Sequence, residues 1–90
     1  MSKDKLKPIR EKIDSIDLKL LRLIQKRGTL AQNVGEIKGL IDKSSSLYRP
    51  DREAEIIRSL TKLNEGVISD TKVKIIFKEI ISACLSLEEQ

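Results

Sequence analysis

LKPIREKIDSIDLKLLRLIQKRGTLAQNVGEIKGL, residues 6–40, places apolar side chains at alternating steps of three and four along its whole length. This spacing is typical of the apolar seam of a helix that packs against other helices in coiled-coil fashion. The seam positions are Leu6, Ile9, Ile13, Ile16, Leu20, Leu23, Leu30, Val34 and Ile37. Arg27 fills the one seam position between Leu23 and Leu30. The stretch therefore predicts one long helix with a cation in its apolar face.

The predicted helix is longer than its own chain can cover. Proline fits the first turn of a helix, so Pro8 places the start near residue 5 and the helix at about residues 5–40. At 1.5 Å per residue such a helix is about 50 Å long, far longer than a compact 90-residue domain is wide. An antiparallel second copy is the simplest cover for the rest of the seam. We therefore expect an intertwined, antiparallel helical homodimer with two-fold symmetry.

A loop and a short helix are expected after the long one. Three consecutive serines and a nearby glycine indicate a loop at residues 41–49. The second helix is predicted at about residues 50–64, because Pro50 suits the first helical position and Gly66 lies just past the end. Its apolar face consists of Ile56, Ile57, Leu60 and Leu63.

A third helix is predicted at about residues 69–88, with Ser69 as its N-cap. Its apolar side is formed by Val73, Ile76, Phe77, Ile80, Cys84 and Leu87. The sequence contains no repeat, glycine-rich phosphate loop or sign of a second domain. We therefore expect one all-α domain over residues 1–90, made of one long, one short and one medium helix.

The composition limits the chemistry that this chain can perform. The absence of histidine excludes a His general base, a Ser–His or Cys–His nucleophile pair and a His metal site within one chain. The carboxylates show no recognisable metal-ligand spacing, so we expect neither a metal nor a cofactor. A single cysteine leaves no disulfide framework and suits a reducing cytoplasm. With no signal peptide and no apolar run long enough to cross a bilayer, we expect a soluble, cytoplasmic protein without a membrane partner.

The net charge of +4 does not by itself indicate nucleic-acid binding. The 18 basic residues are interspersed with 14 acidic ones rather than gathered in a block, and one Phe and one Tyr leave almost nothing to stack on bases. We therefore expect no nucleic-acid partner. A basic nucleic-acid-binding dimer remains an alternative, and its binding would depend steeply on salt.

Arg27 is accompanied by two further cations on or beside the seam. Lys38 lies about 16 Å further along the helix axis, and Arg10 about 25 Å before Arg27. An isolated seam arginine often has only a structural role, in a buried ion pair or as a snorkelling side chain. Several seam cations without matching acids indicate instead an anionic ligand. Two long side chains can converge across about 16 Å but not across about 25 Å, so Arg10 could serve the same pocket only from a second chain.

Three blocks of this sequence, in order, resemble the all-helical AroQ class of chorismate mutases. They are IREKIDSID with the later KR and GEIK, then YRPDREAEII, then FKEIISACLSLE. The resemblance covers about Leu6 to Glu88 and is greatest for the N-terminal mutase domain of bifunctional chorismate mutase/prephenate dehydratase proteins. It implies an isomerase of the shikimate pathway that rearranges chorismate to prephenate for phenylalanine and tyrosine biosynthesis. That [3,3] shift needs no nucleophile, metal or proton transfer, so a chain without histidine could catalyse it.

The resemblance also implies roles for particular residues. Arg27 would bind one substrate carboxylate, Arg10 from a second chain would bind a carboxylate too, and Lys38 would contact the ether oxygen. Arg52 and Glu53 match the family's Arg-Glu pair. Glu53 would accept a hydrogen bond from the substrate hydroxyl, and Arg52 would help to organise the anionic end. Without the resemblance, these two residues would be interpreted as helix-dipole and surface charges.

Three further positions follow from the same resemblance. Arg49 stands where some relatives have an aspartate near the ring hydroxyl, so that contact is open. Cys84 stands where some relatives have a serine near a carboxylate, although a small apolar residue on an inner face usually serves packing. Glu88 occupies the position of a Gln or Glu that donates to the ether oxygen, and a carboxyl group donates only when protonated. Its alternative role is that of a solvated terminal residue.

A non-catalytic helical dimerisation module is the alternative function. The apolar seam alone would be sufficient for such a module. It would not explain Arg27 and Lys38 together with the Arg-Glu pair. Consumption of chorismate distinguishes a mutase from both the dimerisation module and the nucleic-acid-binding dimer.

Overall fold

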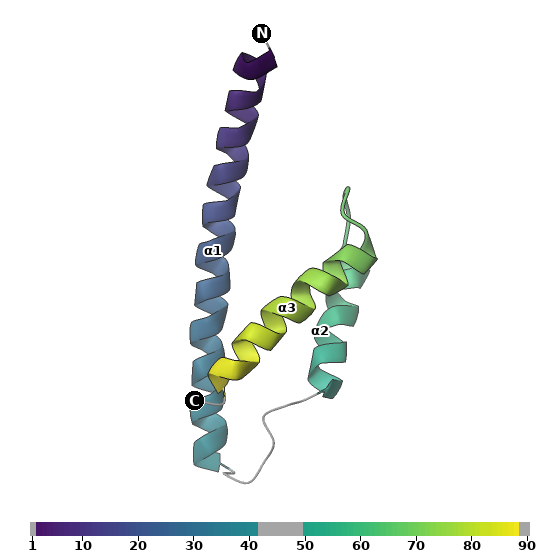
Figure 1. Cartoon of the computed structure of the whole chain (residues 1–90). Coiled ribbons are helices and arrows are strands. Elements are labelled where there is room, and N and C mark those ends of the chain that lie inside the picture. Colours follow the sequence, from purple (N-terminus) through teal and green to yellow (C-terminus); the bar gives the residue numbers. More distant parts are fainter. Residues whose placement is uncertain (1, 42–49, 89–90) are drawn as a thin grey trace.

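The computed structural model describes residues 2–41 and 50–88, and the side chains of residues 5–39 and 50–88. These residues form three helices, α1 (Ser2–Ile41), α2 (Pro50–Leu63) and α3 (Asp70–Glu88), and a turn at residues 64–69. Helix α3 packs on both α1 and α2 and crosses obliquely between them (Figure 1). The all-helical class predicted from the sequence is thus confirmed. Apart from Ile41, which ends α1, the loop expected at residues 41–49 lies outside the described residues.

The N-terminal half of α1 extends well beyond the other two helices (Figure 1). The chain measures 62 × 24 × 15 Å and has a radius of gyration of 17.2 Å. A compact chain of this length would have a radius of gyration of about 12 Å. The long overhang expected from the sequence is therefore present. No helix among the described residues has both the length and the apolar content needed to cross a bilayer.

The apolar seam of α1 is exposed in the single chain. Its nine apolar side chains, from Leu6 to Ile37, are each between 42% and 63% accessible. Among the described residues, the buried apolar side chains are Ala31, Ile57 and Cys84. The chain on its own therefore leaves a long apolar stripe uncovered, interrupted by Arg27. Exposed apolar surface costs about 25 cal/mol per Å² in water, so this stripe is a large free-energy cost for the single chain.

The start of α1 differs from the prediction. The helix begins at Ser2 rather than near residue 5, so Pro8 lies inside the helix and not in its first turn. A proline at this position removes one backbone hydrogen bond, to the carbonyl of Asp4. Only six helical residues precede Pro8, so few packing contacts depend on the geometry of that turn. Water can also satisfy a carbonyl at a helix end.

The apolar faces of α2 and α3 are confirmed only in part. Ile57 and Cys84 are buried, but Leu63 is 77% exposed and Ile76 is 47% exposed. The sequence pattern correctly identifies one apolar side of each helix. The pattern does not predict how much of that apolar side is buried, because burial depends on the size of the contact between the helices of one chain.

The turn from α2 to α3 is fixed by side-chain hydrogen bonds. The Lys72 backbone N–H donates to Ser69 Oγ over 3.2 Å, which confirms Ser69 as the N-cap of α3. Asn64 Nδ2 donates to the Ile68 carbonyl over 3.0 Å and to Asp70 Oδ1 over 2.8 Å. Between them Gly66 has a φ of 130°, which L-residues rarely adopt. The turn thereby sets the angle at which α3 returns across α1.

Ser69→Ala is expected to lower the free energy of unfolding by about 1 kcal/mol, because it leaves the first turn of α3 without its cap. Denaturant unfolding at fixed chain concentration measures the change. Ser86→Ala is the matched control, since Ser86 Oγ donates only to the Ala83 carbonyl within the helix, over 2.7 Å. An equal loss in both variants would contradict the capping role.

Candidate active site

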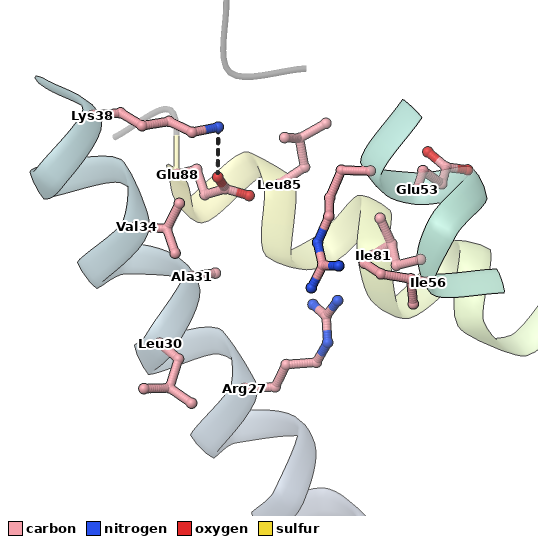
Figure 2. A pocket seen from close by; sticks show the side chains of 11 residues that line it. Arg27, Leu30, Ala31, Val34, Lys38, Glu53, Ile56, Ile81, Leu85 and Glu88 are labelled. Atoms are coloured by element: carbon pink, nitrogen blue, oxygen red, sulfur yellow. Dashed lines mark ion pairs between the residues drawn. The ribbon is translucent and has the colours of Figure 1, made fainter. Parts of the chain in front are cut away.

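A cavity of about 470 Å³ lies where the C-terminal half of α1 faces α2 and α3 (Figure 2). Its lining residues are Arg27, Leu30, Ala31, Val34 and Lys38 from α1, Arg52, Glu53 and Ile56 from α2, and Ile81, Leu85 and Glu88 from α3. Six of these eleven side chains are aliphatic and five are charged. An apolar cleft of this volume with a few charged groups is typical of a small-molecule site.

The residues that α1 contributes share one face because of helical spacing. Ala31 and Lys38 follow Arg27 at steps of four and then seven, so all three point to the same side. Figure 2 shows the Arg27 and Lys38 side chains reaching into the cavity from positions several turns apart. Ala31 lies between them and is buried, and its short side chain leaves the floor of the cavity open.

One end of the cavity holds an ammonium group beside a carboxyl group. Lys38 Nζ lies 3.7 Å from Glu88 Oε1, and the two side chains are 26% and 17% exposed (Figure 2). Partly exposed pairs of this kind stabilise a fold by no more than about 1 kcal/mol. A ligand atom beside this pair can lie within reach of both groups. This end of the cavity can therefore provide one hydrogen-bond donor, Lys38, and a second one when Glu88 carries a proton.

The other polar part of the cavity is dominated by guanidinium groups. Arg27 is half-buried and forms no ion pair with another residue that the structure describes. Arg52 also lines the cavity, and it pairs with Glu55 on the exposed side of α2. A half-buried arginine without an acidic partner favours a ligand carboxylate, which the planar guanidinium can bind through two hydrogen bonds.

The charges around the cavity favour an anion overall. Three cations and two acids line it, which gives a net charge of +1 when both acids are ionised. Aliphatic side chains between them lower the local dielectric and strengthen each contact with a charged ligand. Within the described residues, no cluster of His, Cys, Asp and Glu side chains could hold a metal ion.

The structure brings five of the eight predicted site residues to this one cavity. They are Arg27, Lys38, Arg52, Glu53 and Glu88. These residues are distant in sequence and come from all three helices. Their proximity makes a shared ligand possible, and the individual roles remain predictions.

Of the other three predicted residues, the structure describes two, and neither lines this cavity. Arg10 is exposed on the overhanging part of α1 and does not line the cavity of its own chain. Cys84 is 3% exposed and does not line the cavity either. Arg49 lies outside the described residues.

Sequence reasoning did not identify the apolar walls of the site. The sequence pattern places Leu30 and Val34 in the seam and predicts no role for Ile81 and Leu85, and all four line the cavity. The available signal was the spacing of Ala31, four residues after Arg27 and seven before Lys38, which places a small residue between two cations. A small residue at that position indicates space for a ligand.

Comparison with known proteins assigns this chain to one family. The family profile described as "Chorismate mutase type II" matches residues 9–89. A bifunctional chorismate mutase/prephenate dehydratase from Pseudomonas aeruginosa is 40% identical over 89 residues, covering 96% of this chain and 24% of that protein. A chorismate mutase from Methanocaldococcus jannaschii is 38% identical over 88 residues, covering 97% of this chain and 87% of that protein. The chain thus spans about a quarter of the length of its bifunctional relatives.

Solved structures agree with these matches. Chorismate mutase form II from Thermus thermophilus has a TM-score of 0.90 and 34% identity, with 96% of each chain covered. Chorismate mutase from Helicobacter pylori in complex with prephenate has a TM-score of 0.83 and 26% identity, covering 96% of this chain and 91% of that one. The helices of this chain are therefore arranged as in those two proteins.

Proposed function

Because the chain belongs to the type II chorismate mutase family, we propose that its three-helix cavity rearranges chorismate to prephenate. The observation that carries the proposal is the half-buried Arg27, without an acidic partner among the described residues, in the same cavity as Lys38 and Glu88. Substrate and product are both dicarboxylates, and the related Helicobacter pylori enzyme was solved with prephenate. A cavity of about 470 Å³ is large enough for one such molecule.

The proposed reaction is a concerted shift within one molecule. The C–O bond of the enolpyruvyl ether breaks while a C–C bond forms to the ring, and no proton or group leaves. The chain therefore contributes only orientation and electrostatic stabilisation. Arg27 would hold one carboxylate, and the aliphatic walls would keep the ring and the side chain in the compact shape that reacts and exclude water.

Negative charge develops on the ether oxygen as the C–O bond lengthens. Lys38 would donate to that oxygen from its fixed position at one end of the cavity. Glu88, 3.7 Å from the Lys38 ammonium, would donate to the same oxygen when it carries a proton. Removing one such donor typically slows an enzyme by about 10²–10³-fold. From α2, Arg52 would orient the anionic end of the substrate, and Glu53 would orient its ring hydroxyl.

We also propose that the active form is an antiparallel homodimer whose two sites are each built from both chains. The exposed seam and the overhang of α1 support this, because a second copy can bury both. Arg10 lies about 25 Å along the helix axis from Arg27, beyond the reach of two converging side chains. An antiparallel second copy would bring its own Arg10 to the cavity. The cytoplasmic location and the place in aromatic amino acid biosynthesis remain predictions.

Loss of chorismate absorbance on adding the protein tests the proposal directly. A mutase consumes chorismate at a rate proportional to enzyme concentration and forms prephenate in equal amount. A dimerisation module would leave chorismate unchanged. A nucleic-acid-binding dimer would do the same and would bind DNA with a steep dependence on salt.

Substitutions of Glu88 test its role. An ionised carboxylate beside an ether oxygen that gains negative charge would raise the barrier, so only a group that donates a hydrogen bond should assist the reaction there. Glu88→Gln, whose amide group is always a donor, should therefore keep or improve kcat/KM, whereas Glu88→Ala should lower it.

The control for Glu88→Gln is Glu79→Gln on an exposed part of α3 that does not line the cavity. It should leave kcat/KM unchanged. Equal kcat/KM values for the Glu88→Gln and Glu88→Ala enzymes would remove Glu88 from the reaction.

A further inference from the structure

Two glycines of α1 lie under α3. Gly28 and Gly35 are seven residues apart and therefore share one face of the helix. A Cβ added at Gly28 would lie 3.1 Å from Leu87 Cδ1. A Cβ added at Gly35 would lie 2.9 Å from the Cα and 3.0 Å from the carbonyl carbon of Glu88, and closer still to its carbonyl oxygen. At Gly35 the main chain of α3 therefore rests directly on the main chain of α1.

The two close approaches differ in what has to move. At Gly28 the neighbouring atom is the end of a leucine side chain, which can rotate away. At Gly35 the neighbour is backbone, so an added methyl group would have to displace the last turn of α3 as a unit. That turn carries Glu88, whose carboxyl oxygen lies 3.7 Å from the Lys38 ammonium.

Lys38 follows Gly35 by three residues on the same helix, so the two positions move together. The separation between the Lys38 ammonium and the Glu88 carboxyl group is therefore set by how closely α3 approaches α1 at Gly35. A glycine inside a helix weakens that helix relative to alanine. Gly35 lowers the stability of α1 in this way, and it lies at the point where a larger residue would collide with the backbone of Glu88.

We propose that Gly35 is a positioning residue for the reaction: it lets the backbone of Glu88 lie against α1 and so holds the Glu88 carboxyl group beside Lys38, at the ether-oxygen end of the cavity. This inference rests on the proposed mutase function. Gly35 itself contacts no substrate. It acts through the placement of Glu88, and its effect should therefore disappear when the Glu88 carboxyl group is absent.

Gly35→Ala is expected to lower kcat roughly 10- to 100-fold and to change KM less than about threefold, because the donor at the ether oxygen moves while Arg27 still binds its carboxylate. Steady-state kinetics of chorismate consumption separates the two constants. Gly39→Ala is the matched control, since an added Cβ there meets nothing within 4 Å. It should leave kcat unchanged and raise the Tm, as expected for alanine in place of an exposed helical glycine.

The decisive comparison is made in a Glu88→Ala background. There, Gly35→Ala should lower kcat by less than about threefold further, because the displaced group is no longer present. Equal losses in the two backgrounds would overturn the inference, and so would a Gly35→Ala enzyme as active as Gly39→Ala. Failure of Gly35→Ala to fold, judged by circular dichroism, would also overturn it, since the contact would then be a requirement of the fold. A wild-type chain without mutase activity would instead refute the proposed function.

Discussion

Arg27→Ala is expected to lower kcat/KM for chorismate by about 10³-fold while the protein remains folded and associated. The guanidinium is half-buried at the cavity and has no ion-pair partner among the described residues. Its removal would take away a charge-assisted contact to a substrate carboxylate. The substitution would not leave a buried acid without a partner. Such an unpaired charge is the reason why breaking an internal ion pair is strongly destabilising.

Arg22→Ala provides the matched control for this substitution. Arg22 is exposed on the same helix and does not line the cavity, so the same change of side chain there should leave the activity within about twofold of the wild type. Circular dichroism and sedimentation would establish folding and association for both variants. If Arg27→Ala unfolds and the wild type does not consume chorismate, the seam arginine is a structural residue.

Much of the fold follows from local patterns in the sequence. The steps of three and four from Leu6 to Ile37 predict a helix longer than the chain can cover, and α1 has that length and exposure. Ser69 is recognisable as a cap because a hydroxyl before a helix accepts from the first turn. The helix start predicted from Pro8 was wrong. The steric rule for proline does not consider how few packing contacts depend on the turn that precedes Pro8.

The candidate site is predictable only in part, for a physical reason. Arg27 and Lys38 share a helix, so periodicity alone places them on one face. Arg52, Glu53 and Glu88 belong to other helices, so periodicity along one helix does not place them near Arg27. In the sequence, only the resemblance to a known family predicts that these three residues belong to the site.

The close approach at Gly35 could not be predicted at all. It depends on the angle at which α3 crosses α1, and that angle is set by the turn around Gly66 and by packing across both helices. The exposure of Leu63 and Ile76 could not be predicted from the sequence pattern either, because it depends on which side chains the helices of the single chain cover.

Mixing two inactive variants should restore activity if each site is built from two chains. Arg10→Ala and Arg27→Ala would each remove one carboxylate contact from every site of their own homodimer. In a heterodimer, one of the two sites receives Arg27 from the first chain and Arg10 from the second, and the other site receives neither. Random pairing in an equal mixture makes half of the dimers heterodimers, so about a quarter of all sites should become fully wild-type. Because each variant alone is nearly inactive, this is a recovery of roughly several hundredfold.

The experiment requires co-refolding from denaturant, since folding and association are expected to be one event. The matched control mixes wild type with a chain that carries both substitutions. Its heterodimers have no complete site, so activity should fall from about half to about a quarter of the wild-type value as the chains exchange. A site contained within one chain predicts the reverse pattern: no recovery in the first mixture and a constant half in the second. That pattern, with heterodimers demonstrated by native mass spectrometry, would rule out the shared site and leave Arg10 without a role in it.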